Sequence, residues 1–147
     1  MGTRADFYIG KEWLGSVGWD GYPEGISEYI LSAQTRGEFK GEVMSFLLQR
    51  DDATFPKQGW PWPWNDSNTT DYAYVWDGRL RVACFGSWIN PETGEEIGGD
   101  KPEFPDMSAV KNITWGTDRG GVMIMGSKDG AYNGTLGILN EDDDYVP

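Results

Sequence analysis

Residues 59–86, GWPWPWNDSNTTDYAYVWDGRLRVACFG, carry the strongest structural signals of the chain. Trp60 and Trp62 each precede a proline, which pushes their backbones into extended conformations and excludes a helix. Asp77-Gly78 lies between two runs of alternating pattern and predicts a β-hairpin, because a type I′ turn needs positive φ at both central residues. The stretch therefore predicts an extended tryptophan–proline segment that leads into a hairpin.

A two-residue turn at Asp77-Gly78 fixes the register of this hairpin. It pairs Trp76 with Arg79 and Tyr74 with Arg81, and it leaves the other face small and aliphatic. An aromatic ring opposite a guanidinium suits a cation–π contact, worth about 0.5–1 kcal/mol when exposed. Tyr74, Trp76, Arg79 and Arg81 are therefore one predicted binding face, with plain stabilisation of the sheet as the alternative.

The second predicted binding surface is the tryptophan ladder, Trp60, Trp62 and Trp64. Exposed tryptophans anchor protein interfaces, and their faces stack on bases or sugars. The alternative is a clamp over the edge of the core, because large aromatic side chains are more often buried than displayed.

Length and composition predict one domain, residues 1–147, of the α+β class. The 147 residues are enough for a core without disulfides. The 21 Gly and 8 Pro favour turns and short strands, while 8 Trp, 7 Tyr and 6 Phe supply buried area. We expect an antiparallel sheet with one main amphipathic helix, about residues 35–50, packed on one face.

That helix is predicted from its cap and its apolar stripe. Thr35 and Glu38 form a capping box, in which Glu38 reaches back to the Thr35 amide. The stripe that follows has helical spacing and contains Phe39, Val43, Phe46 and Leu47, widened by Met44 and Leu48. A short helix is expected at 28–33, before the main one.

Several strands and one acidic loop complete the expected fold. Residues 6–9 and 13–19 alternate and predict an N-terminal hairpin, and the glycines of its second strand indicate either a bulge or another element that packs close. Residues 90–106 are rich in Pro, Gly and acidic side chains and predict a mobile excursion. Further strands are expected at 110–115, 122–125 and 132–139, ahead of a solvated acidic run at 141–144.

The chain lacks most catalytic side chains. It has no histidine, which is the commonest general base and metal ligand, and its single cysteine, Cys84, is expected to be buried and inert. The acidic run Asp51-Asp52 lacks the ligand spacing of a calcium loop and is expected to be solvated. No catalytic residue, metal site or cofactor is predicted, and we lean away from an enzyme. A reaction that uses a pair of carboxylates stays an open alternative.

A formal net charge of −12 distinguishes between classes of partner. Such a surface repels nucleic-acid phosphates and anionic membranes and favours a protein partner with a basic surface, although acidity also serves solubility alone. No apolar run approaches the roughly 18 residues of a membrane helix, and the N-terminus does not resemble a signal peptide. We expect a cytoplasmic protein; its oligomeric state is open.

Three segments together resemble a family of small bacteriophage and prophage proteins of uncharacterised function. They are GTRADFYIG with EWLGSVGWDGYPEGI, then RDDATFPKQGWPWPWNDSNTTDYAYVWDG, and the CFG that follows, and they span about the first two-thirds of the chain. The resemblance brings no catalytic residues. It implies a phage accessory protein that binds a host protein without catalysis, for example an inhibitor of host defence such as an anti-CRISPR. The alternative is a module that binds or sequesters a small ligand such as a nucleotide.

Overall fold

The computed structural model describes residues 2–111 of the chain. They belong to two compact units, each described here by itself. Among the described residues, the sheet unit comprises 2–53 and 66–105, and the ladder unit comprises 54–65 and 106–111. That residues 1–147 form a single domain stays a prediction.

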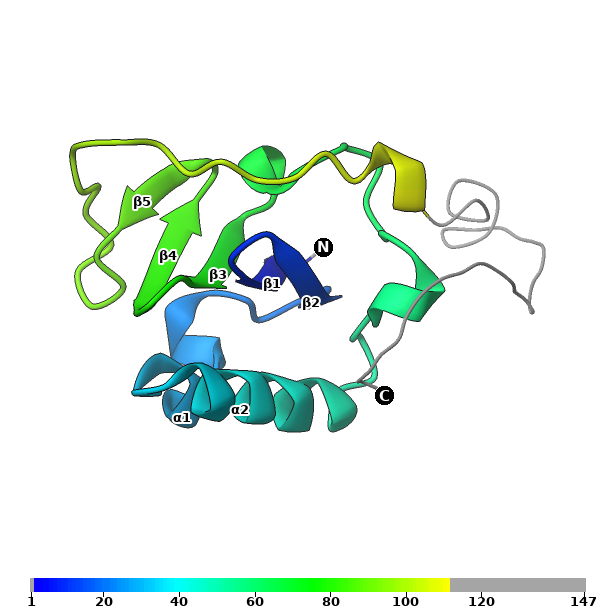
Figure 1. The fold of residues 1–147 in the computed structure, drawn as a ribbon, viewed down its shortest axis with the longest axis horizontal. Coiled ribbons are helices and arrows are strands. Elements are labelled where there is room, and N and C mark those ends of the chain that lie inside the picture. Colours follow the sequence, from blue (N-terminus) through cyan, green and yellow to red (C-terminus); the bar gives the residue numbers. More distant parts are fainter. Residues whose placement is uncertain (1, 112–147) are drawn as a thin grey trace. The chain divides into compact units, whose positions relative to one another are not determined.

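The sheet unit contains a five-stranded sheet of order β2-β1-β3-β4-β5 (Figure 1). The strands are β1 (Ala5–Ile9), β2 (Glu12–Val17), β3 (Tyr72–Trp76), β4 (Leu80–Cys84) and β5 (Ser87–Ile89). The predicted N-terminal hairpin is present, with a bulge in the pairing of β1 with β2. The α+β class is confirmed.

The sheet is mixed rather than wholly antiparallel, because β1 and β3 pair in parallel while the other neighbours are antiparallel. A parallel pair needs a long crossover connection. Here the crossover contains the 3₁₀ turn Pro23–Gly25, the short helix α1 (Glu28–Leu31) and the main helix α2 (Arg36–Leu48).

Helix α2 begins at the predicted cap and buries most of the predicted stripe. The Thr35 hydroxyl accepts the Glu38 N–H at 3.1 Å, and the Glu38 carboxylate accepts the N–H of Gln34 at 2.8 Å, one residue earlier than expected. Phe39, Val43 and Leu47 are buried, and Phe46 packs edge-on against Phe7 of β1. Leu48 is 70% exposed, so the prediction that it widens the stripe is wrong.

The sheet face away from α2 holds a buried polar network around Asp6. This fully buried carboxylate accepts hydrogen bonds from the hydroxyls of Ser16, at 2.5 Å, and Ser67, at 2.6 Å. The Tyr8 hydroxyl lies 2.7 Å from Ser67, and the Trp13 indole N–H donates to Ser16. Burial and then the charge of Asp6 raise the pKa of Tyr8. The network ties β1 and β2 to the 3₁₀ turn Ser67–Thr69.

The β3–β4 hairpin forms in a register one residue away from the prediction. Trp76 pairs with Leu80 rather than Arg79, so the connection has three residues, 77–79. The Asp77 N–H donates to the Arg79 carbonyl at 3.1 Å, and Gly78 supplies a φ of 94°.

Burial of the strands against α2 explains this register. The observed pairing places Val82 opposite the buried Tyr74, where the predicted one would have placed Arg81. Because side chains alternate along a strand, the one-residue change moves Arg81 to the opposite face of the sheet. An apolar partner for Tyr74 avoids the cost of burying a charge.

Residues 90–97 form a hydrogen-bonded hairpin, where an irregular excursion is predicted. The Asn90 N–H donates to Glu95 at 2.9 Å, and the Ile97 N–H donates to Trp88 at 2.8 Å. Further along, Phe104 packs against Tyr8, with ring centroids 5.5 Å apart. The strands expected at 122–125 and 132–139, most of the one at 110–115, and the acidic run lie outside the described residues.

Candidate binding surface

The tryptophan ladder lies in the ladder unit, between the 3₁₀ turn Pro56–Gln58 and residue 65. Trp60 is fully buried; its backbone N–H donates to Val110 at 2.9 Å, and its indole N–H donates to the Trp64 carbonyl at 2.7 Å. Trp62 and Trp64 are half-buried and stack with ring centroids 5.7 Å apart. Trp60 is therefore a core residue, and the other two form a stacked pair that is partly accessible.

The four predicted hairpin residues do not share one exposed face. Tyr74 and Trp76 are buried: the Tyr74 hydroxyl donates to the Gly21 carbonyl at 2.6 Å, and Trp76 stacks on Phe39 of α2. Arg79 is exposed at the turn.

Arg81, on the opposite face, lies over the Trp88 ring with its guanidinium carbon 3.9 Å from the centroid. It also forms ion pairs with Asp77 and Asp100. The cation–π partner of Arg81 is thus Trp88 rather than Tyr74, and the predicted aromatic–arginine platform is not assembled.

Four other aromatic side chains of residues 2–111 are exposed; Tyr29 (62%) lies in α1, and the other three belong to loops at one end of the sheet. Trp19 (50% exposed) and Tyr22 (37%) follow β2, and Phe85 (60%) follows β4. Because β2 and β4 run in the same direction, their C-terminal ends lie at the same end of the sheet. We call residues 18–25 with 85–86 the aromatic end. The alternating pattern predicts a strand that includes Trp19, but β2 ends at Val17.

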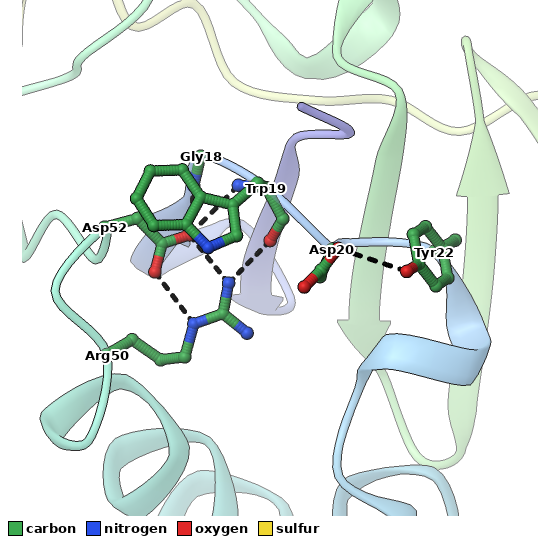
Figure 2. Close-up of polar contacts among 6 residues, drawn as sticks. All are labelled: Gly18, Trp19, Asp20, Tyr22, Arg50 and Asp52. Carbon is green, nitrogen blue, oxygen red and sulfur yellow. Dashed lines mark hydrogen bonds and ion pairs between the residues drawn. The ribbon is translucent and has the colours of Figure 1, made fainter. Parts of the chain in front are cut away.

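A buried carboxylate holds the first of these loops in place (Figure 2). Asp52 accepts the backbone N–H groups of Gly18 and Trp19, both at 2.9 Å. Arg50 donates to both Asp52 oxygens at 2.7 Å and to the Trp19 carbonyl at 2.6 Å. We call Arg50 and Asp52 the clasp. The Asp52 side chain is only 2% exposed, so the prediction of a solvated Asp52 is wrong.

The clasp is an ion pair over the neutral pH range. Burial alone would raise the pKa of Asp52, but the hydrogen bonds from Arg50, Trp19 and Gly18 outweigh it and leave the pKa below its usual value. The hydrogen bond to Asp52 in turn raises the pKa of Arg50. Both groups therefore stay charged, and the loop is fixed at its base while the Trp19 side chain remains half exposed.

The same loop then crosses the end of β1. The Gly21 N–H donates to Thr3 at 2.8 Å, and a Cβ at Gly21 would lie 2.7 Å from the Ala5 Cβ, so only glycine fits. The Tyr22 hydroxyl donates to Asp20 at 3.1 Å, a bond that raises the Tyr22 pKa (Figure 2).

Backbone strain is concentrated at the aromatic end. Phe85 and Gly86 form the two-residue turn between Cys84 and Ser87, with φ values of 47° and 80°. Positive φ at both positions is the requirement of a type I′ turn, which prefers Asn, Asp or Gly. Within residues 2–111, Asp20 (φ 56°) and Phe85 are the two non-glycine residues with positive φ.

Comparisons with protein-family models, with curated proteins and with solved structures return no match for this chain. No helix in residues 2–111 is both long and apolar enough to cross a membrane. In the same residues, no group of three or more His, Cys, Asp or Glu side chains is placed to hold a metal ion. Cys84 is half-buried opposite Tyr72, so the prediction of a buried thiol is wrong; its partial burial raises the pKa of the thiol.

Proposed function

We propose that this chain is a phage or prophage accessory protein that binds a host protein with a basic surface, in the host cytoplasm, without catalysing a reaction. The resemblance supports the phage setting and favours a component of host defence as the target. The observation that carries the proposal is the excess of negative charge: 24 acidic side chains oppose 12 basic ones.

Four of the basic side chains in the described residues are paired within the chain itself. Arg4, Lys11, Arg50 and Arg81 each form an ion pair with an acidic side chain of the chain itself. Each pair uses one acidic side chain as well, so the net charge of −12 is unchanged and acts on a partner. Such a field accelerates association with a basic surface, more strongly at low ionic strength, and it repels nucleic acid.

The test is capture of partners by the immobilised full chain from bacterial host lysate. At about 0.05 M salt the Debye length is longer than at about 0.5 M, so we expect a specific protein to be retained at low salt and released at high salt. The matched variants change Glu92, Glu95 and Glu96 together, in the exposed hairpin, either to Gln or to Asp. The Gln variant should retain less of the partner, and the Asp variant, which keeps the charge, should behave as the native chain.

Retention of no protein above a bait-free control at low salt would contradict the proposal. The alternative, a module that binds a small ligand such as a nucleotide, had relied on an exposed aromatic–arginine face. Because Tyr74 and Trp76 are buried and Arg81 stacks on Trp88, no described contact favours it. A nucleotide that raised the Tm of the chain would reverse this preference, since a ligand of the folded state stabilises it.

A further inference from the structure

We infer that the aromatic end is a docking surface for a lysine- or arginine-rich segment of the partner protein, with Trp19, Tyr22 and Phe85 as its anchors. This inference rests on the proposed function and assigns it a place on the molecule. Three kinds of observation carry it: the spacing of the three side chains, the charges beside them, and the rigidity of the loops that present them.

The three anchors span a length suited to an extended peptide. Strands β2 and β4 are separated by β1 and β3, which at about 4.8 Å per strand spacing gives about 14 Å between the two loops. Tyr22 lies on the path between them, because Gly21 is bonded to Thr3 and to the Tyr74 hydroxyl. About five extended residues, at about 3.3 Å each, cover this distance.

The chemistry of the surface suits a cationic segment. Aromatic faces attract ammonium and guanidinium groups within about 6 Å of the ring centroid. Asp20 and Glu24 are exposed beside the anchors, and neither forms an ion pair among the described residues. The arginines at this end are held by their own acidic partners: Arg50 by Asp52, and Arg4 by Asp71. The aromatic end therefore offers rings and carboxylates to a basic partner.

The backbone of the loops that carry these exposed side chains is fixed by hydrogen bonds and by the surrounding structure. The clasp bonds the backbone on both sides of the Trp19 Cα, through its N–H and its carbonyl. Strained φ values at Asp20 and Phe85 persist because the surrounding structure fixes them, and strain of this kind gathers at functional sites. An anchor that is already rigid loses less conformational entropy on binding.

The sheet unit has a second acidic surface that is an alternative binding site for a cationic segment. The hairpin at 90–97 carries Glu92, Glu95 and Glu96 and exposes Ile97, but it has no aromatic side chain. It attracts cations at long range without a ring on which they can stack. The two surfaces can therefore be separated by experiment.

The test measures binding of an oligoarginine peptide to the full chain by calorimetry, with a glycine–serine peptide of equal length as the control ligand. The combined Trp19→Ala, Tyr22→Ala and Phe85→Ala variant should lose about tenfold or more in affinity, as expected when anchors are removed. The Glu92→Gln, Glu95→Gln, Glu96→Gln variant should lose only about two- to threefold and show a weaker salt dependence. Tyr22→Phe, which keeps the ring, should bind as the native chain.

Amide chemical shifts locate the peptide independently of the variants. We expect changes at 18–25 and 85–86. Changes confined to 90–97, or an equal loss of affinity in the two triple variants, would overturn this docking surface and leave the proposed function standing. Absence of oligoarginine binding at low salt would also overturn the docking surface. The proposed function is tested separately, and it fails if the full chain retains no protein from the lysate. Circular dichroism of the aromatic triple variant verifies that the fold is intact.

Discussion

Two loops of this chain carry tryptophan beside glycine and proline, and they place it in opposite ways. In the ladder, Trp60 is fully buried. In the aromatic end, Trp19 is half exposed, although it follows a strand whose own Trp13 is buried. Glycine and proline do not separate the two loops, because both loops carry them beside tryptophan.

The difference lies in what satisfies the polar groups of each loop. In the ladder the partners are backbone carbonyls. The Trp60 backbone N–H donates to Val110, and the Trp60 indole N–H donates to the Trp64 carbonyl, a hydrogen bond that the ring makes while it is buried. The loop of Trp19 uses charged side chains, because Asp52 and Arg50 satisfy its N–H and carbonyl groups. The indole of Trp19 is not required for this pairing, so it is left available for a partner.

The largest effect is expected from removal of the buried ring. Trp60→Ala should lower the free energy of unfolding by about 4 kcal/mol, because it leaves a cavity the size of an indole and the Trp64 carbonyl without its donor. Urea unfolding followed by near-UV circular dichroism measures the change.

The matched control is Trp19→Ala, which should change the free energy of unfolding by no more than about 0.5 kcal/mol, as is usual for an exposed side chain. Equal losses in the two variants would mean that burial does not distinguish the two tryptophans.

A smaller but pH-dependent effect is expected at the clasp. Asp52→Asn should cost about 3 kcal/mol at neutral pH, because Arg50 and two backbone N–H groups lose a charged acceptor that is almost fully buried. The pKa of Asp52 is lower in the folded chain than in the unfolded one. The contribution of the carboxylate is therefore complete above the unfolded value of about 3.9 and disappears as pH falls through the folded value.

Urea unfolding over a pH series tests this sign. The difference between the native chain and Asp52→Asn should be constant from neutral pH down to about 5 and should shrink below about 4. Asp51→Asn is the neighbouring control: its side chain is exposed, and we expect a change below about 0.5 kcal/mol at every pH. A difference that stayed constant down to pH 3 would show that the charge of Asp52 does not carry the stabilisation.

The parts of the fold that were predicted depend on neighbours in sequence. The Thr35 cap, the stripe of α2 and the two hairpins each follow from residues a few positions apart. The parallel pairing of β1 with β3 could not be predicted this way, because the crossover separates them. The register at Asp77-Gly78 also depends on residues distant in sequence: the turn accepts two or three residues, and burial of Tyr74 against Phe7 selects between them.

The aromatic end could not be predicted from the sequence either, because it also depends on contacts between residues that are distant in sequence. The sequence predicts a solvated Asp51-Asp52 pair, because the backbone N–H groups that bind the Asp52 carboxylate belong to residues 18 and 19, far away in sequence. Trp19 continues an alternating pattern, which predicts a strand. The one local signal was Phe85-Gly86 directly after a strand, since a phenylalanine before the glycine of a tight turn is unusual.

The smallest effect, and the one that separates binding from stability, is expected at Phe85. Phe85→Asn should raise the free energy of unfolding by about 1 kcal/mol, because asparagine tolerates a φ of 47° and the exposed ring makes little contribution to the core. If the ring is an anchor, the same variant should bind oligoarginine more weakly than the native chain although it is more stable. Unfolding in urea and calorimetry on one preparation give both values. Loss of stability would show that the ring supports the fold, and unchanged affinity would remove Phe85 from the docking surface.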